Sequence, residues 1–237
     1  YYASIISCVK NCKFFAIMNG RRHDTFFDDF DRYENLRIDN FFVFGEDFKD
    51  YVIKRIPNTT VSGSIIANHF LRKKEFRKPK KIQYISLFQS SYYKNKGNFE
   101  LKSEFQNLDN NFYMPTTEFT LKILEKFAVD NSLDLEIIPR TNWNQEEEFY
   151  SKMISKYTIS KKVGFENSYN SISDEAIIIG CTSTFVMESF AAGYRTGFLT
   201  FRQEVIPPNH PEVFRYVEWA WPGKTDKTGF FWSNRMD

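Results

Sequence analysis

A turn rich in hydroxyl groups near the middle of the C-terminal half has the residue types and spacing of a phosphate-binding site. The apolar run Ala176–Ile179 ends at Gly180, and a helical pattern begins four residues later. The first N–H groups of a helix have no acceptor within the helix and carry the positive end of its dipole, so such a turn can hold an anion. The hydroxyl-bearing residues that we expect to assist are Thr182, Ser183 and Thr184.

A carboxylate lies one helical turn beyond this site. Glu188 is four residues after Thr184, which places both on one face of the predicted helix. There a carboxylate can accept hydrogen bonds from a ribose diol while a phosphate lies at the helix end. The alternative interpretation is that Ser183 is an ordinary N-cap and that Glu188 is a surface residue.

Two further polar segments follow predicted strands. Arg140 comes after the run Leu133–Ile138, and Gln89 and Ser90 come after Ile82–Leu87. In an open parallel sheet, ligands bind beyond the carboxyl ends of the strands. We therefore predict that these segments converge with the hydroxyl-rich turn in one binding site. A solvent-exposed arginine and an ordinary polar loop are the alternatives.

The elements that must position these residues alternate between short apolar runs and helical patterns, which indicates an α/β protein with a parallel sheet. Most of the runs are apolar on both faces, as is typical of sheets with helices on both sides. The predicted strands are Phe14–Met18, Phe41–Phe44, Ile82–Leu87, Leu133–Ile138, Ala176–Ile179 and Gly197–Thr200. The predicted helices are Glu46–Arg55, Thr117–Val129, Glu146–Lys156 and Thr184–Ala192. In the second of these helices, the apolar face is assigned to Phe119, Ile123, Leu124 and Phe127.

The charged stretch 72–81 interrupts this alternation and contains Pro79. A β-α run with the size of one nucleotide-binding domain follows it. We therefore expect residues 1–74 to form the end of an N-terminal domain with a linker, and residues 75–237 to form a C-terminal domain. The sequence lacks an initiating Met and stops just after Ser233-Asn234, which resembles a helix cap, so a truncated C-terminal domain and a longer parent protein are expected.

Composition excludes several classes of protein. The 237 residues carry a net charge of +2, which argues against a nucleic-acid partner, and no apolar run approaches the roughly 18 residues of a membrane span. Three scattered cysteines and three scattered histidines form no metal-ligand pattern, so we expect no metal, no cofactor and a cytoplasmic location. Asp29-Phe30-Asp31 has the spacing of a metal-chelating pair, but it lies in an acidic loop with no apolar strand immediately before it.

The segment from Ala176 to Gly193 resembles the C-terminal domain of GT-B glycosyltransferases, particularly Kdo-transferase-like enzymes of bacterial lipopolysaccharide and capsule biosynthesis. It shares with them a strand, a Ser/Thr pair at a helix start and a Glu on the same helix. The stretches 14–20 and 41–64 are similar to parts of the N-terminal domain of that family. Here Asn19-Gly20 replaces the usual turn with a His, and Arg140 follows Pro139 where a His-Pro pair is common.

The resemblance implies a GT-B-like fold, with two Rossmann-like domains, that transfers a sugar from a nucleotide-activated donor such as CMP-Kdo to a surface glycan. The helix start at Ser183 and Arg140 would stabilise the departing phosphate without a metal. His23 and Asp24 would supply the general base on the N-terminal side. A lipid-linked acceptor would be compatible with peripheral association at the inner membrane. The alternatives are a polyol-phosphate transferase of the teichoic-acid type, a nucleotide-sugar 2-epimerase and a non-catalytic nucleotide- or carbohydrate-binding domain.

Overall fold

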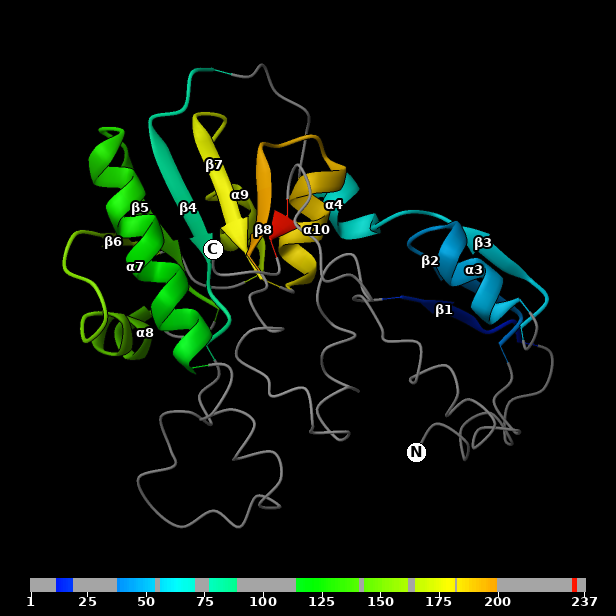
Figure 1. Cartoon of the computed structure of the whole chain (residues 1–237). Helices are drawn as coiled ribbons and strands as arrows, with labels where there is room; N and C mark the ends of the chain where they lie inside the picture. Colours follow the sequence, from blue (N-terminus) through cyan, green and yellow to red (C-terminus); the bar gives the residue numbers. More distant parts are fainter. Residues whose placement is uncertain are drawn as a thin grey trace, which may run out of the picture. The chain divides into compact units, whose positions relative to one another are not determined.

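In the computed structural model the chain forms two compact units, Tyr1–His69 and Phe70–Asp237 (Figure 1). Both units contain parallel sheets flanked by helices, so the predicted α/β class is confirmed. The structure describes residues 12–18, 38–53, 56–70, 77–88, 114–140, 143–161, 165–181, 183–199 and 232–233.

The first unit contains a three-stranded parallel sheet in the order β1-β2-β3. Its strands are β1 (Phe15–Ile17), β2 (Asn40–Val43) and β3 (Thr59–Val61), and its described helices are α3 (Glu46–Val52) and α4 (Ile65–Phe70), which reaches the division between the units. Since side chains alternate along a strand, one face buries Met18, Phe41 and Val43 against Val52 and Ile56.

The opposite face of this sheet is open to solvent at β1. Phe15 and Ile17 are 60% and 56% exposed, and the Phe15 ring stacks on Phe42 with 6.3 Å between ring centroids. The expectation of burial on both faces is therefore wrong for β1.

The second unit contains six parallel strands in the order β6-β5-β4-β7-β8-β9. From β4, the next two strands along the chain, β5 and β6, are added on one side, and β7, β8 and β9 are added on the other side of β4. This is the strand order of a Rossmann fold. The direction in which successive strands are added therefore reverses between β4 and β7. The strands are β4 (Lys81–Ile85), β5 (Asp134–Ile138), β6 (Thr158–Ile159), β7 (Ala176–Gly180), β8 (Thr196–Leu199) and β9 (Trp232–Ser233).

Helices flank the sheet: α7 runs along β4 and β5, and α10 packs beside β7 and β8 (Figure 1). Ile82 and Tyr84 of β4 share a core with α7 and α8, whereas Val186 of α10 reaches the opposite face at Gly180 and Ile85. A Cβ on Gly180 would overlap the Val186 side chain, so the glycine allows α10 to approach the strand closely. The helices are α7 (Met114–Asp130), α8 (Trp143–Tyr150), α9 (Phe165–Asn170) and α10 (Thr184–Ala191).

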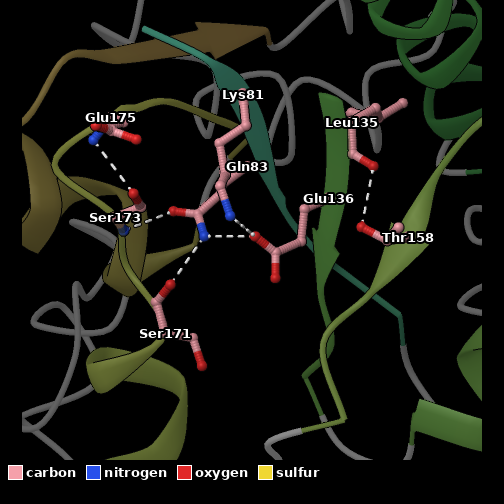
Figure 2. A network of polar contacts seen from close by, with 8 residues as sticks. All are labelled: Lys81, Gln83, Leu135, Glu136, Thr158, Ser171, Ser173 and Glu175. Carbon is pink, nitrogen blue, oxygen red and sulfur yellow. Dashed lines mark hydrogen bonds and ion pairs between the residues drawn. The ribbon is translucent and has the colours of Figure 1, made fainter. Parts of the chain in front are cut away.

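A buried glutamine ties the connection between α9 and β7 to the middle of this sheet (Figure 2). Gln83 is fully buried, and its Nε2 donates to Glu136 Oε2 and to the Ser171 carbonyl oxygen, both at 2.8 Å. The Ser173 N–H donates to Gln83 Oε1 at 3.0 Å, and Lys81 Nζ lies 3.0 Å from Glu136 Oε2. The crossover that returns the chain to β7 is thus bonded to β4 through Gln83, and Gln83 is bonded in turn to β5.

The six predicted strands are present with ends shifted by at most two residues, whereas β3, β6, β9, α4 and α9 were not predicted. The helix expected over Glu146–Lys156 begins and ends earlier, at Trp143 and Tyr150. The apolar face assigned to α7 is partly wrong, since Ile123 and Phe127 are 38% and 46% exposed. The face of this helix that packs on the core contains Leu121, Leu124 and Ala128. It is rotated about the helix axis relative to the face that carries Phe119 and Phe127.

Candidate functional site

The carboxyl ends of β4, β5 and β7 lie side by side at one edge of the six-stranded sheet. Ile85 of β4 is paired with Ile138 of β5, and Tyr84 is paired with Ile179 of β7, all in parallel. Arg140 and the β7–α10 turn therefore emerge at the same edge, as the sequence predicted. The reversal of strand order between β4 and β7 makes this edge the expected ligand-binding crevice of the fold.

Ser183 is the N-cap of α10 in the β7–α10 turn. Its Oγ accepts a hydrogen bond from the Phe185 N–H at 3.3 Å, and its carbonyl oxygen accepts one from the Val186 N–H at 3.1 Å. The cap satisfies donors that a bare helix end would offer to an anion. The Ser183 hydroxyl proton can still be donated outward, because a hydroxyl donates one hydrogen bond while it accepts others. Thr184 is the first residue of α10 and is half-buried.

Glu188 lies one turn further along α10 and is 5% exposed, so the alternative that it is a surface residue is wrong. The Tyr169 hydroxyl of α9 donates to Glu188 Oε2, and the Tyr169 ring lies 4.4 Å from the Phe185 ring. Burial raises the pKa of the Tyr169 phenol above its usual value, and the Glu188 carboxylate raises it further. A ribose diol would compete with this phenol for Oε2.

Arg140 follows the buried Pro139 at the end of β5, and its side chain is exposed. Its backbone N–H donates to Oε1 of Glu146 at 2.7 Å, and Glu146 is fully buried in the first turn of α8. A buried carboxylate thus fixes the backbone that carries the predicted phosphate-binding guanidinium.

Polar groups missed by the sequence analysis lie beneath this edge. The Tyr150 hydroxyl lies 2.6 Å from Ser86 Oγ in a buried contact. Burial raises the pKa of the Tyr84 phenol, nearby Cys181 and Glu146 add to the shift, and a hydrogen bond with Thr117 opposes it. The only signal in the sequence was the spacing of Glu146 and Tyr150, which places both on one helix face.

Several predicted site residues lie outside the described part of the chain: His23, Asp24, Gln89, Ser90 and Thr182. Their predicted roles stay predictions. The Asp29–Asp31 pair, which was not expected to bind a metal, also lies outside the described ranges. Within the described ranges, His, Cys, Asp and Glu side chains form no group of three or more that could hold a metal ion. None of the described helices is long and apolar enough to cross a membrane.

Comparison with known proteins connects this Rossmann-like chain to surface carbohydrate biosynthesis. No curated protein sequence is significantly similar to the chain. Residues 15–237 match the model of a family described as "putative O-antigen biosynthesis protein". Because the match covers both units and nearly the whole sequence, the chain belongs to this O-antigen biosynthesis protein family.

Proposed function

We propose that the chain is a GT-B-like, metal-independent glycosyltransferase that uses a nucleotide-activated sugar, with a CMP-Kdo-like donor favoured. The observation that carries the proposal is the position of the β7–α10 turn and Arg140 at the edge where the strand order reverses. Family membership supports a role in building surface glycans, and such assembly consumes activated sugars. The nucleotide would bind to the second unit.

The chemistry would follow from charge stabilisation. As the sugar leaves, negative charge develops on the nucleotide phosphate, and preorganised donors lower the barrier when they are aimed at that charge. The Ser183 hydroxyl, the positive end of α10 and the exposed Arg140 guanidinium would be those donors. Arginine suits this role because its planar group can bind two phosphate oxygens at once.

The acceptor would be a glycan or a lipid-linked glycan, which is compatible with cytoplasmic work at the inner membrane surface. Deprotonation of its hydroxyl requires a general base within hydrogen-bond reach. His23 and Asp24 are the two proposed candidates for this base. The test of this part is donor turnover by the chain with His23→Ala and, separately, Asp24→Asn.

The donor site is tested by calorimetric titration of CMP, CDP, UDP and GDP into the chain. We expect saturable binding of a cytidine nucleotide that is unchanged by EDTA. Arg140→Ala should weaken binding at least about tenfold, since it removes a charge-assisted contact. Arg77→Ala is the matched control, because Arg77 is an exposed arginine that pairs with Glu175 and precedes β4 at the amino edge.

A second variant separates the helix cap from anion binding. Ser183→Asp keeps an N-cap acceptor of similar quality, so the fold should be retained, but it places a negative charge where the phosphate is proposed to lie. Nucleotide binding should therefore be lost in a chain of normal stability. If the folded wild-type chain binds none of the four nucleotides, the donor site is wrong. Binding without turnover of any donor sugar would favour the non-catalytic alternative.

A further inference from the structure

Helix α8 contacts the segments that follow β4 and β5 at the carboxyl edge of the sheet. Its two inward-facing polar residues, Glu146 and Tyr150, are four positions apart and thus lie on one face. Both are fully buried. Buried polar groups are costly unless they are hydrogen-bonded, so the partners of these side chains indicate what the residues do.

Glu146 holds the loop after β5. Its Oε1 accepts the hydrogen bond from the Arg140 N–H at 2.7 Å, a short charge-assisted contact. Pro139, which precedes Arg140, is buried and restricts the backbone by its ring. The amino-terminal side of Arg140 is thus fixed by the hydrogen bond and by the restricted residue before it, and this limits where its exposed guanidinium can reach.

Tyr150 holds the segment after β4. Its hydroxyl contacts Ser86 Oγ at 2.6 Å, and the same Ser86 Oγ accepts a hydrogen bond from the Phe88 N–H at 3.0 Å. The Ser86 N–H donates to the carbonyl oxygen of Ile138 at 3.0 Å, which joins this segment to the end of β5. The segment from Ser86 to Phe88, which follows β4, is therefore held in place by hydrogen bonds to α8 and to the end of β5.

We infer that Glu146 and Tyr150 are positioning residues that hold Arg140 in place relative to the carboxyl end of β4, the strand that neighbours β7. The inference rests on the proposed donor site and extends it to two residues that do not touch the nucleotide. A single rigid helix face links Arg140 to the strand end next to the β7–α10 turn. Simultaneous contact of Arg140 and the β7–α10 turn with one phosphate requires both to be held in place, because hydrogen bonds weaken steeply when their distance and angle depart from the preferred values.

The experiment measures nucleotide affinity and thermal stability in the same variants. CMP, CDP, UDP and GDP are titrated into the wild type, Glu146→Ala, Glu146→Gln and Tyr150→Phe. Glu146→Ala should lower the affinity of the bound nucleotide at least about tenfold, since it removes a hydrogen bond of a charged group. Glu146→Gln should stay within about threefold, because its amide oxygen can still accept from the Arg140 N–H.

Tyr150→Phe removes only the hydroxyl and should lower affinity about threefold to tenfold. The matched controls are Glu148→Gln and Tyr157→Phe. Glu148 is exposed on the same helix and pairs with Lys152, and the Tyr157 hydroxyl donates to the Glu147 carbonyl oxygen away from the binding edge. Both controls should bind like the wild type.

The outcomes separate positioning from a structural role. If the wild type binds a nucleotide and the folded Glu146→Ala and Tyr150→Phe chains bind it equally well, the positioning role is wrong and the donor site stands. If the wild type binds none of the four, the donor site fails and the inference fails with it. If Glu146→Ala does not fold, Glu146→Asp takes its place and is judged by the same criterion alongside Tyr150→Phe. The aspartate side chain is shorter, so from the same backbone position its carboxylate cannot reach the Arg140 N–H that Glu146 binds at 2.7 Å.

Discussion

Gln83 and Glu136 are directly opposite each other on neighbouring strands, and the buried amide of Gln83 donates to the Glu136 carboxylate at 2.8 Å. The same amide group binds Ser171 and Ser173 of the α9–β7 connection. This connection carries the chain from one edge of the sheet back to β7, the strand that leads into the proposed donor turn. The hydrogen bonds of Gln83 (the Gln83 network) therefore hold the connection that leads into β7 and the proposed donor site.

Gln83→Ala should destabilise the second unit by about 2–4 kcal/mol, because it leaves several buried donors and acceptors unsatisfied. Urea denaturation followed by circular dichroism measures this change in the free energy of unfolding. Lys122→Ala is the control, since it removes only an exposed ion pair with Glu118 and should cost about 0.5 kcal/mol or less. If Gln83→Ala lowers the free energy of unfolding as little as the control does, the Gln83 network contributes little to stability.

The pair Tyr169 and Glu188 should show strong energetic coupling. Tyr169→Phe leaves a buried carboxylate without its phenol donor and should cost about 1–3 kcal/mol of stability. Glu188→Gln in the Tyr169→Phe background should cost less than Glu188→Gln alone, with a coupling energy of at least about 1 kcal/mol. Additive costs in this double-mutant cycle would contradict the direct bond between the two side chains.

The parts of the fold that the sequence predicted are those with a local signal. β7 is a continuous apolar run, and β4 and β5 are short runs in which apolar residues outnumber polar ones. A parallel sheet brings the carboxyl ends of such strands to one edge whatever the details of packing. This is why Arg140 and Ser183 could be assigned to a common edge. In contrast, β6 and β9 have only two residues each, too few for any periodicity.

The parts that could not be predicted depend on contacts between distant residues. Ser86 and Tyr150 are 64 positions apart, and Tyr169 of α9 donates its hydrogen bond to Glu188 of α10, a different helix. Glu146 was interpreted only as the start of a helix, because an acidic residue in a first turn is a common surface feature. Its burial follows from the packing of α8 on β4 and β5, which no local pattern reveals.

Gly180 should tolerate no larger side chain while Val186 is present. Gly180→Ala forces a Cβ into the Val186 side chain and should destabilise the second unit by about 1–3 kcal/mol. Shortening the neighbour should relieve the overlap, so Gly180→Ala combined with Val186→Ala should be more stable than the sum of the two single costs predicts. Thermal denaturation of the four chains measures this, and a strictly additive result would show that the overlap with Val186 is not the cause of the destabilisation.

Stability should fall when the pH rises above about 10, the ordinary pKa of tyrosine. Burial raises the pKa of Tyr84 and of Tyr169 in the folded chain. At alkaline pH the unfolded chain therefore loses phenol protons that the folded chain keeps, and the free energy of unfolding decreases with pH. Tyr84→Phe removes one such proton, so its stability should decrease less steeply than that of the wild type between about pH 10 and 12. Urea titrations at several pH values measure both slopes, and equal slopes would show that Tyr84 ionises as readily in the folded chain as in the unfolded one.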